Sequence, residues 1–239
     1  FVDEYALASR LSYFLWSTMP DTQLFRLAEK RELRKNLDAQ VKRMLADSRS
    51  EAFIENFVGQ WLQTRDVDGI DINAFVVLGR DRGEEREFRR TRARLDELRA
   101  KTTLTPEEEK EREQIIESRR KRFANRRMVE LDGELRRALR RETEMAFSHV
   151  MRENRSVLEL IDADYTFLNE RLAQHYNLTN LNIKGGEMRR VSLPKDTARG
   201  GILTHGSVLI VTSNPTRTSP VKRGLFVLDN LLGTPPPPP

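Results

Sequence analysis

The residues with the most evident chemical potential gather between positions 199 and 223. They combine guanidinium, ammonium and hydroxyl groups, and together they predict an anion- or partner-binding site formed by Arg199, Ser213, Arg217, Thr218, Ser219, Lys222 and Arg223. Ser219 followed by Pro220 is typical of a helix N-terminus, with serine as the N-cap and proline at the first helical position. The unpaired N–H groups of a helix start, beside cations, favour an anion. A plain helix start with solvated cations explains the same pattern.

A second group of residues offers acid–base chemistry. Asp162, Asp164 and Tyr165 lie in a polar segment, 162–169, that is expected to form a bend. If the bend directs both carboxylates into one cleft, they can act as acid and base on a polymeric substrate. Local capping and turn hydrogen bonds explain these residues without catalysis. Glu142 and Glu144 are two positions apart on a predicted helix and so point in different directions, which argues against a carboxylate pair there.

The histidine and cysteine content limits cofactor chemistry. The chain has no cysteine, which excludes thiolate nucleophiles, cysteine zinc sites and covalent haem attachment within these residues. With three histidines in total, a multi-histidine metal site is not expected, so we predict no metal site and no cofactor within the chain. His205 lies in a predicted helix from 202 to 211. There it is either a possible haem-facing ligand or an ordinary interior histidine.

The elements that position these groups follow from apolar residues at helical spacing. Amphipathic helices are expected over 3–16, over 33–45 and 53–62, and over 129–151. A further short helix is expected after Pro20 and Asp21, which suit a helix N-terminus. One short strand is expected at 188–194. The fold class is therefore all-α: a multi-helix bundle with a projecting charged antiparallel helical hairpin and at most one short β-hairpin.

The charged hairpin is predicted in residues 80–127, which hold the whole basic excess of the chain. This segment has 17 Lys and Arg against 12 Asp and Glu; the remaining 25 of each sign cancel, which leaves the net charge of +5. Thr105 and Pro106 predict a turn and a new helix start. Acidic residues interleave with the arginines and no aromatic platform accompanies them. The pattern therefore favours ion pairs along the helices over nucleic acid as a partner.

The domain organisation follows from these elements. We expect a helical core domain over 1–183 with the hairpin 80–127 inserted, a second helical segment over 184–234 that packs on the core, and a polyproline linker over 235–239. No stretch of about 18 apolar residues is present, so no membrane span is expected.

Several blocks of the sequence, taken in order, carry a resemblance to a known family. They are residues 11–21 (LSYFLWSTMPD), 60–62 (QWL), 164–169 (DYTFLN), 199–205 (RGGILTH), 218–224 (TSPVKRG) and 231–234 (LLGT). The set resembles the planctomycete-type secreted, cytochrome c-associated multidomain proteins, and it covers nearly the whole chain except the 80–127 insert. The resemblance implies a central helical domain of unknown function, plus the start of the following domain, in a periplasmic or extracellular protein.

The resemblance also implies a c-type haem in a downstream domain, and that haem domain or another protein as the partner. It carries over no catalytic residue. We therefore predict a non-catalytic structural or docking domain that positions the haem domain. The alternative is part of an extracellular enzyme, with Asp162, Asp164 and Tyr165 in its cleft.

Overall fold

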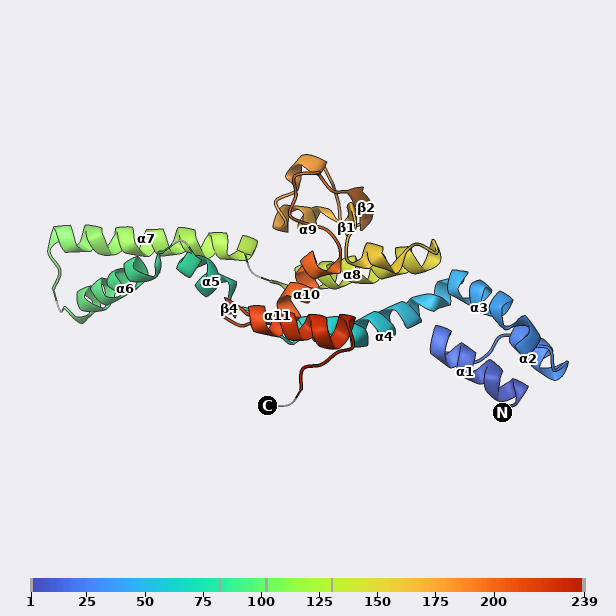
Figure 1. The fold of residues 1–239 in the computed structure, drawn as a ribbon. Helices are drawn as coiled ribbons and strands as arrows, with labels where there is room; N and C mark the ends of the chain where they lie inside the picture. The colour runs from blue at the N-terminus through green and yellow to red at the C-terminus, as the bar shows by residue number, and fades with distance from the viewer. Residues whose placement is uncertain (1, 82, 102, 130, 238–239) are drawn as a thin grey trace.

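The computed structural model describes the backbone of residues 2–237 except 82, 102 and 130, and their side chains except 75, 78, 81, 85 and 122–129. The described chain is mostly helical, which confirms the predicted class (Figure 1). In the residues described, the strands form two short antiparallel pairs, and the pair within residues 213–218 is a short hairpin, as the prediction allowed. No helix in the described part of the chain is long and apolar enough to cross a membrane.

The N-terminal lobe contains three helices, α1 (Glu4–Trp16), α2 (Thr22–Glu29) and α3 (Leu37–Ala46), with single 3-10 turns η1 (Arg34–Asn36) and η2 (Ser48–Ser50). All three helices were predicted. Asp21 caps α2 by accepting a hydrogen bond from the N–H of Leu24, as the Pro-Asp pair indicated.

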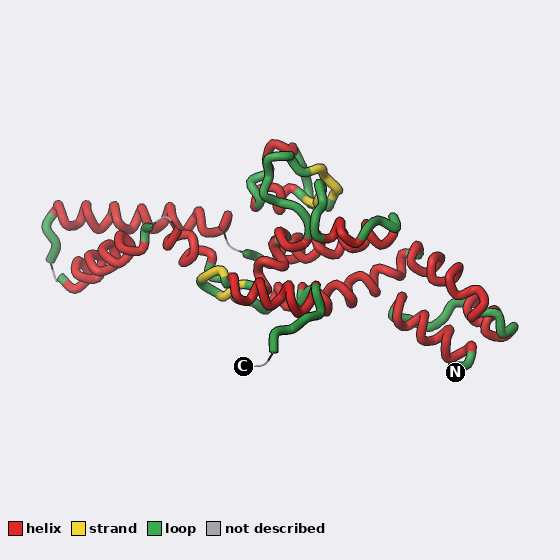
Figure 2. The backbone as a smooth tube through the Cα atoms, viewed as in Figure 1, coloured by secondary structure: helices red, strands yellow, loops and turns green. Residues whose placement is uncertain are grey.

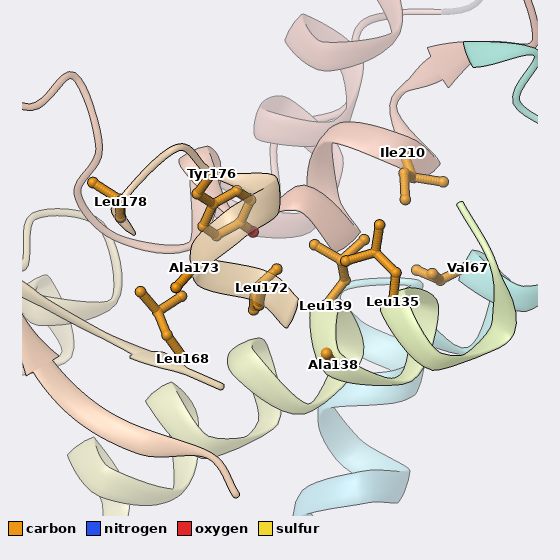
Figure 3. Close-up of a cluster of buried hydrophobic side chains, with 10 residues drawn as sticks. All are labelled: Val67, Leu135, Ala138, Leu139, Leu168, Leu172, Ala173, Tyr176, Leu178 and Ile210. Atoms are coloured by element: carbon orange, nitrogen blue, oxygen red, sulfur yellow. The ribbon is translucent and has the colours of Figure 1, made fainter. Parts of the chain in front are cut away.

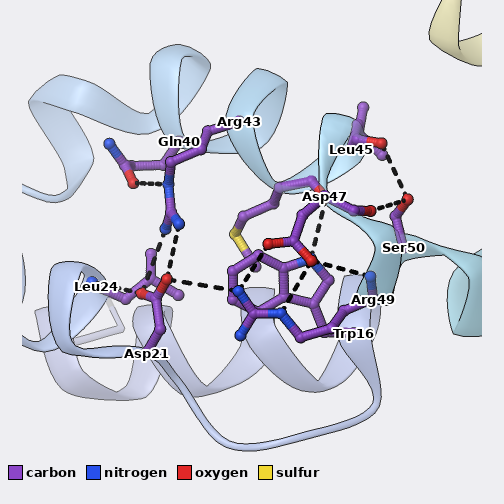
Figure 4. Close-up of polar contacts among 10 residues, drawn as sticks. Trp16, Asp21, Leu24, Gln40, Arg43, Leu45, Asp47, Arg49 and Ser50 are labelled. Carbon is purple, nitrogen blue, oxygen red and sulfur yellow. Dashed lines mark hydrogen bonds and ion pairs between the residues drawn. The ribbon is translucent and has the colours of Figure 1, made fainter.

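Trp16 holds this lobe together from the end of α1 (Figure 4). Its indole N–H donates to the carbonyl of Met44, 3.0 Å away, in the interior. The guanidinium of Arg49 lies 3.5 Å from the centre of its ring, a close cation–π contact. Arg43 pairs with Asp21 at 2.7 Å, so α2 and α3 are tied by charge as well as by packing.

The centre of the molecule contains α4 (Glu51–Trp61), the 3-10 helix η3 (Thr64–Asp68), α8 (Gly133–Arg152), α10 (Gly206–Val211) and α11 (Pro220–Phe226), which continues as a π-helical turn, η7 (Val227–Leu231). The largest core cluster lies between α8, α9 (Glu170–His175) and α10 and includes Leu139, Leu172 and Ile210 (Figure 3). Segments distant in the sequence therefore share one interior.

The charged segment forms the predicted hairpin. After α5 (Ala74–Asp81), helices α6 (Glu85–Ala100) and α7 (Pro106–Val129) run antiparallel and project from the body (Figures 1 and 2). Leu95 and Leu98 are 1% exposed and form its seam. Thr105 and Glu108 form a reciprocal capping box at the start of α7. Arg94 pairs with Glu111 across the two helices at 2.9 Å.

A small lobe carries the 3-10 turns η4 (Val157–Leu160) and η5 (Thr179–Leu181), strand β1 (Tyr165–Leu168), α9 (Glu170–His175) and strand β2 (Arg189–Ser192). The β2 strand was expected. Its partner strand, β1, was not expected, since it lies in the segment predicted as a bend. The two strands are separated in the sequence by α9, and Leu168 pairs with Arg189. All four β1 residues are buried, so this strand lacks the alternation that marks a half-buried strand.

The predicted helix over 202–211 is wrong in one respect. It is broken into a 3-10 turn, η6 (Ile202–Thr204), and α10, with His205 between them in an extended conformation at ψ 137°. Gly201 enters this turn at φ +65°, which only glycine adopts readily with ψ near 180°. Past α10, the strands β3 (Ser213–Asn214) and β4 (Arg217–Thr218) form a tight hairpin.

Candidate functional site

A pocket of about 490 Å³ lies where the start of α5, α8, α9, α10 and the β3–β4 hairpin meet. Most of its surface is apolar, and the walls include Ile72, Val77, Leu131, Leu139, Leu209 and Ile210. Its polar groups include Arg199, Arg217, His175, Ser213 and Asn214. An apolar cavity of this size with a few convergent polar groups is the usual form of a ligand site.

The structure brings together four of the seven residues predicted to bind an anion or partner. Arg199, Ser213, Arg217 and Thr218 line the pocket, whereas Ser219, Lys222 and Arg223 do not. Ser219 is the N-cap of α11 as expected, accepting from the N–H of Lys222 at 3.3 Å.

The two remaining cations of the predicted site make contacts within the chain. The ammonium of Lys222 donates to the carbonyl of Ser213 at 3.4 Å. Arg223 Nε donates to Thr212 Oγ1 at 3.5 Å. Both contacts join α11 to the end of α10 and to β3.

Arg199 is held in a defined orientation at the pocket. Its guanidinium lies 3.3 Å from the centre of the Tyr176 ring, and Nη1 donates to the carbonyl of Thr204 at 2.9 Å. Arg217 is exposed on β4. Within the described part of the chain, neither arginine forms an ion pair with an acidic side chain. Both guanidinium charges therefore remain available to an anion.

His175 also lines the pocket, which the sequence did not indicate. Desolvation lowers the pKa of its imidazole, and the positive charges of Arg171 and Arg199 lower it further. The ring is therefore neutral near pH 7, and it can donate or accept a hydrogen bond without adding charge.

A buried hydrogen-bond network lies directly behind the pocket, centred on Glu142, which is 1% exposed. Thr166 Oγ1 donates to Glu142 Oε1 at 2.6 Å, and the Tyr176 hydroxyl donates to Oε2. The same hydroxyl accepts the N–H of Gly206 at 2.8 Å. Burial and the negative charge of Glu142 raise the pKa of Tyr176 well above its usual value. The phenol is thus a permanent donor.

His205 belongs to this interior network. It is 3% exposed; Nδ1 lies 3.0 Å from Thr143 Oγ1, and Nε2 lies 3.9 Å from Glu142 Oε1. Thr143 Oγ1 is also hydrogen bonded to Ser207 Oγ at 2.7 Å. Burial lowers the pKa of His205, which keeps it neutral. Coordination of a haem iron by His205 would first require one of these contacts to open.

The acid–base candidates lie elsewhere, in the small lobe. Asp162 and Asp164 are exposed, and neither lines the pocket. Tyr165 is buried, donates to Glu159 Oε2 at 3.0 Å, and has the guanidinium of Arg190 4.3 Å from its ring centre. Burial and the Glu159 carboxylate raise the pKa of Tyr165.

Sequence reasoning missed Tyr176 and Glu142 as members of the site. One signal was present in the sequence, since Glu142 lies on the same apolar face of α8 as Leu135, Leu139 and Ala146. A carboxylate on that face is expected to be buried and to need hydrogen-bond partners. Glu144, two residues on, instead pairs with Arg140 and Arg141, so the two carboxylates point in different directions, as the spacing predicted. Among the described residues, no group of acidic or histidine side chains is arranged to hold a metal ion.

Comparison with known families gives two matches. The chain belongs to the family described as PSD4, protein of unknown function (DUF1592), whose model matches residues 2–178. Residues 199–239 match PSCyt3, protein of unknown function (DUF1588). The two names fit the resemblance to planctomycete-type, cytochrome c-associated proteins. No curated protein and no solved structure matches the chain.

Proposed function

We propose that the chain is a non-catalytic structural and docking domain of an exported, cytochrome c-associated protein, in which it positions a downstream haem domain or another protein partner. The supporting observation is that the two family-matched segments, 2–178 and 199–239, share one interior. The place where the second segment leaves the core towards a downstream domain is then fixed relative to the first segment.

The first part of this junction is the buried network. Tyr176 accepts the N–H of Gly206, and Thr143 contacts both His205 and Ser207. In each pair, one residue belongs to the first matched segment and the other to the second. Buried polar contacts of this kind fix one arrangement, because an alternative packing would leave the same groups unsatisfied.

The second part of the junction joins α4 to η7. The indole N–H of Trp61 donates to the carbonyl of Asn230 at 2.6 Å, and the Asn230 amide donates back to the carbonyl of Trp61. The backbone N–H of Asn73 donates to the carbonyl of Pro215 at 2.8 Å, and this bond fixes the β3–β4 hairpin as well. The second segment is thus attached at both ends.

Exposed cations on the second segment support a charged docking face. Arg217 and Lys222 are exposed, and neither forms an ion pair with an acidic side chain in the described residues. Positive patches of this kind steer an acidic partner surface and set its orientation more than its affinity.

Cross-linking with an amine-reactive reagent and mass spectrometry of the full-length protein tests this function. Lys222 should form cross-links to the haem-containing domain, and Lys30, which is also exposed and follows α2, should form none. Asn230→Ala should reduce the Lys222 cross-links, since it removes one bond of the junction. Absence of Lys222 cross-links, or equal frequency at Lys30, would refute the docking role.

A further inference from the structure

The pocket has features that docking of a protein domain does not require. We propose that it binds a small carboxylate with an apolar body, such as an aromatic or medium-chain aliphatic acid. Nothing in the docking role depends on this ligand, so each proposal stands or fails separately.

The dimensions of the pocket fit a small molecule. Its volume of about 490 Å³ lies within the range of roughly 300–1,000 Å³ that is typical of small-ligand sites. The walls are mostly apolar and include the branched aliphatic side chains of Ile72, Val77, Leu131, Leu139, Leu209 and Ile210. Such walls favour an apolar body, since each buried methylene contributes about 0.8 kcal/mol.

The charge of the pocket selects an anion. Among the residues whose side chains the structure describes, Arg199 and Arg217 are the charged members of the lining, and no aspartate or glutamate is among them. Glu142, the nearest buried carboxylate in the network, already accepts from Thr166 and Tyr176. The charged groups that these residues offer to a ligand are therefore both guanidinium groups, which favour a carboxylate.

Arg199 is oriented for this role by its own contacts. Stacking on Tyr176 covers one face of the guanidinium, and the bond to Thr204 uses Nη1. The remaining N–H donors lie in the guanidinium plane, which suits a planar carboxylate. Ser213 and Asn214 in the lining supply neutral polar groups for a second contact. A single carboxylate matches this set better than a phosphate, because the walls offer mostly apolar surface.

Isothermal titration calorimetry with a matched pair of probes tests the proposal. The acid is naphthalene-2-carboxylate and the neutral analogue is naphthalene-2-carboxamide, which has the same apolar body. We expect the acid to bind with about tenfold or greater preference over the amide, the size expected for one charge-assisted pair. Octanoate provides a second acid with a flexible body.

Two variants locate the site. Arg217→Gln removes an exposed guanidinium of the lining and should weaken binding of the acid about tenfold, without affecting the fold. Arg26→Gln removes another exposed charge, on α2 in the N-terminal lobe, and should leave binding unchanged. Three results would overturn the proposal: neither acid binding at millimolar concentration, equal affinity for acid and amide, or equal affinity of the Arg217→Gln variant and wild type.

Discussion

Gly201 allows the 199–205 loop to pack closely against the backbone of residues 160–161. Its replacement by alanine is expected to be severely destabilising. A Cβ at this position would lie 2.1 Å from the carbonyl oxygen of Ile161, 2.3 Å from its carbonyl carbon and 2.7 Å from the oxygen of Leu160. These are backbone atoms, so no side-chain rotation relieves the contact. Gly201 also has φ +65° and ψ 177°, a conformation that L side chains rarely adopt.

The magnitude follows from both effects. The unfavourable backbone conformation costs about 1–3 kcal/mol, and overpacking against fixed atoms costs about 1–3 kcal/mol more. Together they predict a loss of roughly 4 kcal/mol in the free energy of unfolding, a large fraction of the 5–15 kcal/mol typical of a domain. For a chain of this length the corresponding fall in Tm is about 8–16 °C.

Chemical denaturation followed by circular dichroism measures this loss, with Gly186→Ala as the matched control. A Cβ at Gly186 meets no heavy atom within 4 Å, so its effect should lie within about 0.5 kcal/mol of wild type. Because the loop carries Arg199 and His205, Gly201→Ala should also weaken naphthalene-2-carboxylate binding in whatever fraction still folds. A loss below about 1 kcal/mol, or one equal to that of the control, would refute the packing argument.

Two further predictions concern the buried network. Tyr176→Phe should cost about 3 kcal/mol in chemical denaturation, because it leaves Glu142 and the N–H of Gly206 short of a partner; near-wild-type stability would show that the hydroxyl is dispensable. Below pH 6.5, the free energy of unfolding should fall by up to about 1.4 kcal/mol per pH unit from His205, since its lowered pKa lets the unfolded imidazole take up the proton first. His205→Gln should flatten this slope between pH 6.5 and 5, and an identical slope in the variant would contradict the assignment.

Local signals were enough to predict most helices and the hairpin. The capping residues Asp21, Thr105 and Ser219 each bond the backbone N–H that their position indicated. Periodic apolar residues gave α1, α3, α4 and α8, because one buried face is imposed by helical geometry alone. In the same way, a two-residue offset on α8 was enough to separate Glu142 from Glu144.

Long-range pairing was not readable in the same way. Strand β1 finds its partner β2 across an intervening helix, and its four buried residues give no alternation to mark it. The extended conformation at His205 depends on contacts with Thr143 and Glu142, which come from another part of the chain. No window of sequence around residue 205 contains those partners.

The sequence by itself therefore determined the helical class, the charged hairpin and the residue types of the proposed anion site, since these depend on spacing and capping along the chain. Only the tertiary structure decided which cations share a pocket. It placed Arg199 and Arg217 around an apolar cavity and stacked Arg199 on Tyr176, while Ser219, Lys222 and Arg223 fell outside the lining. The physical reason is that a pocket is formed by side chains from several elements, and their meeting is fixed by core packing rather than by proximity in sequence.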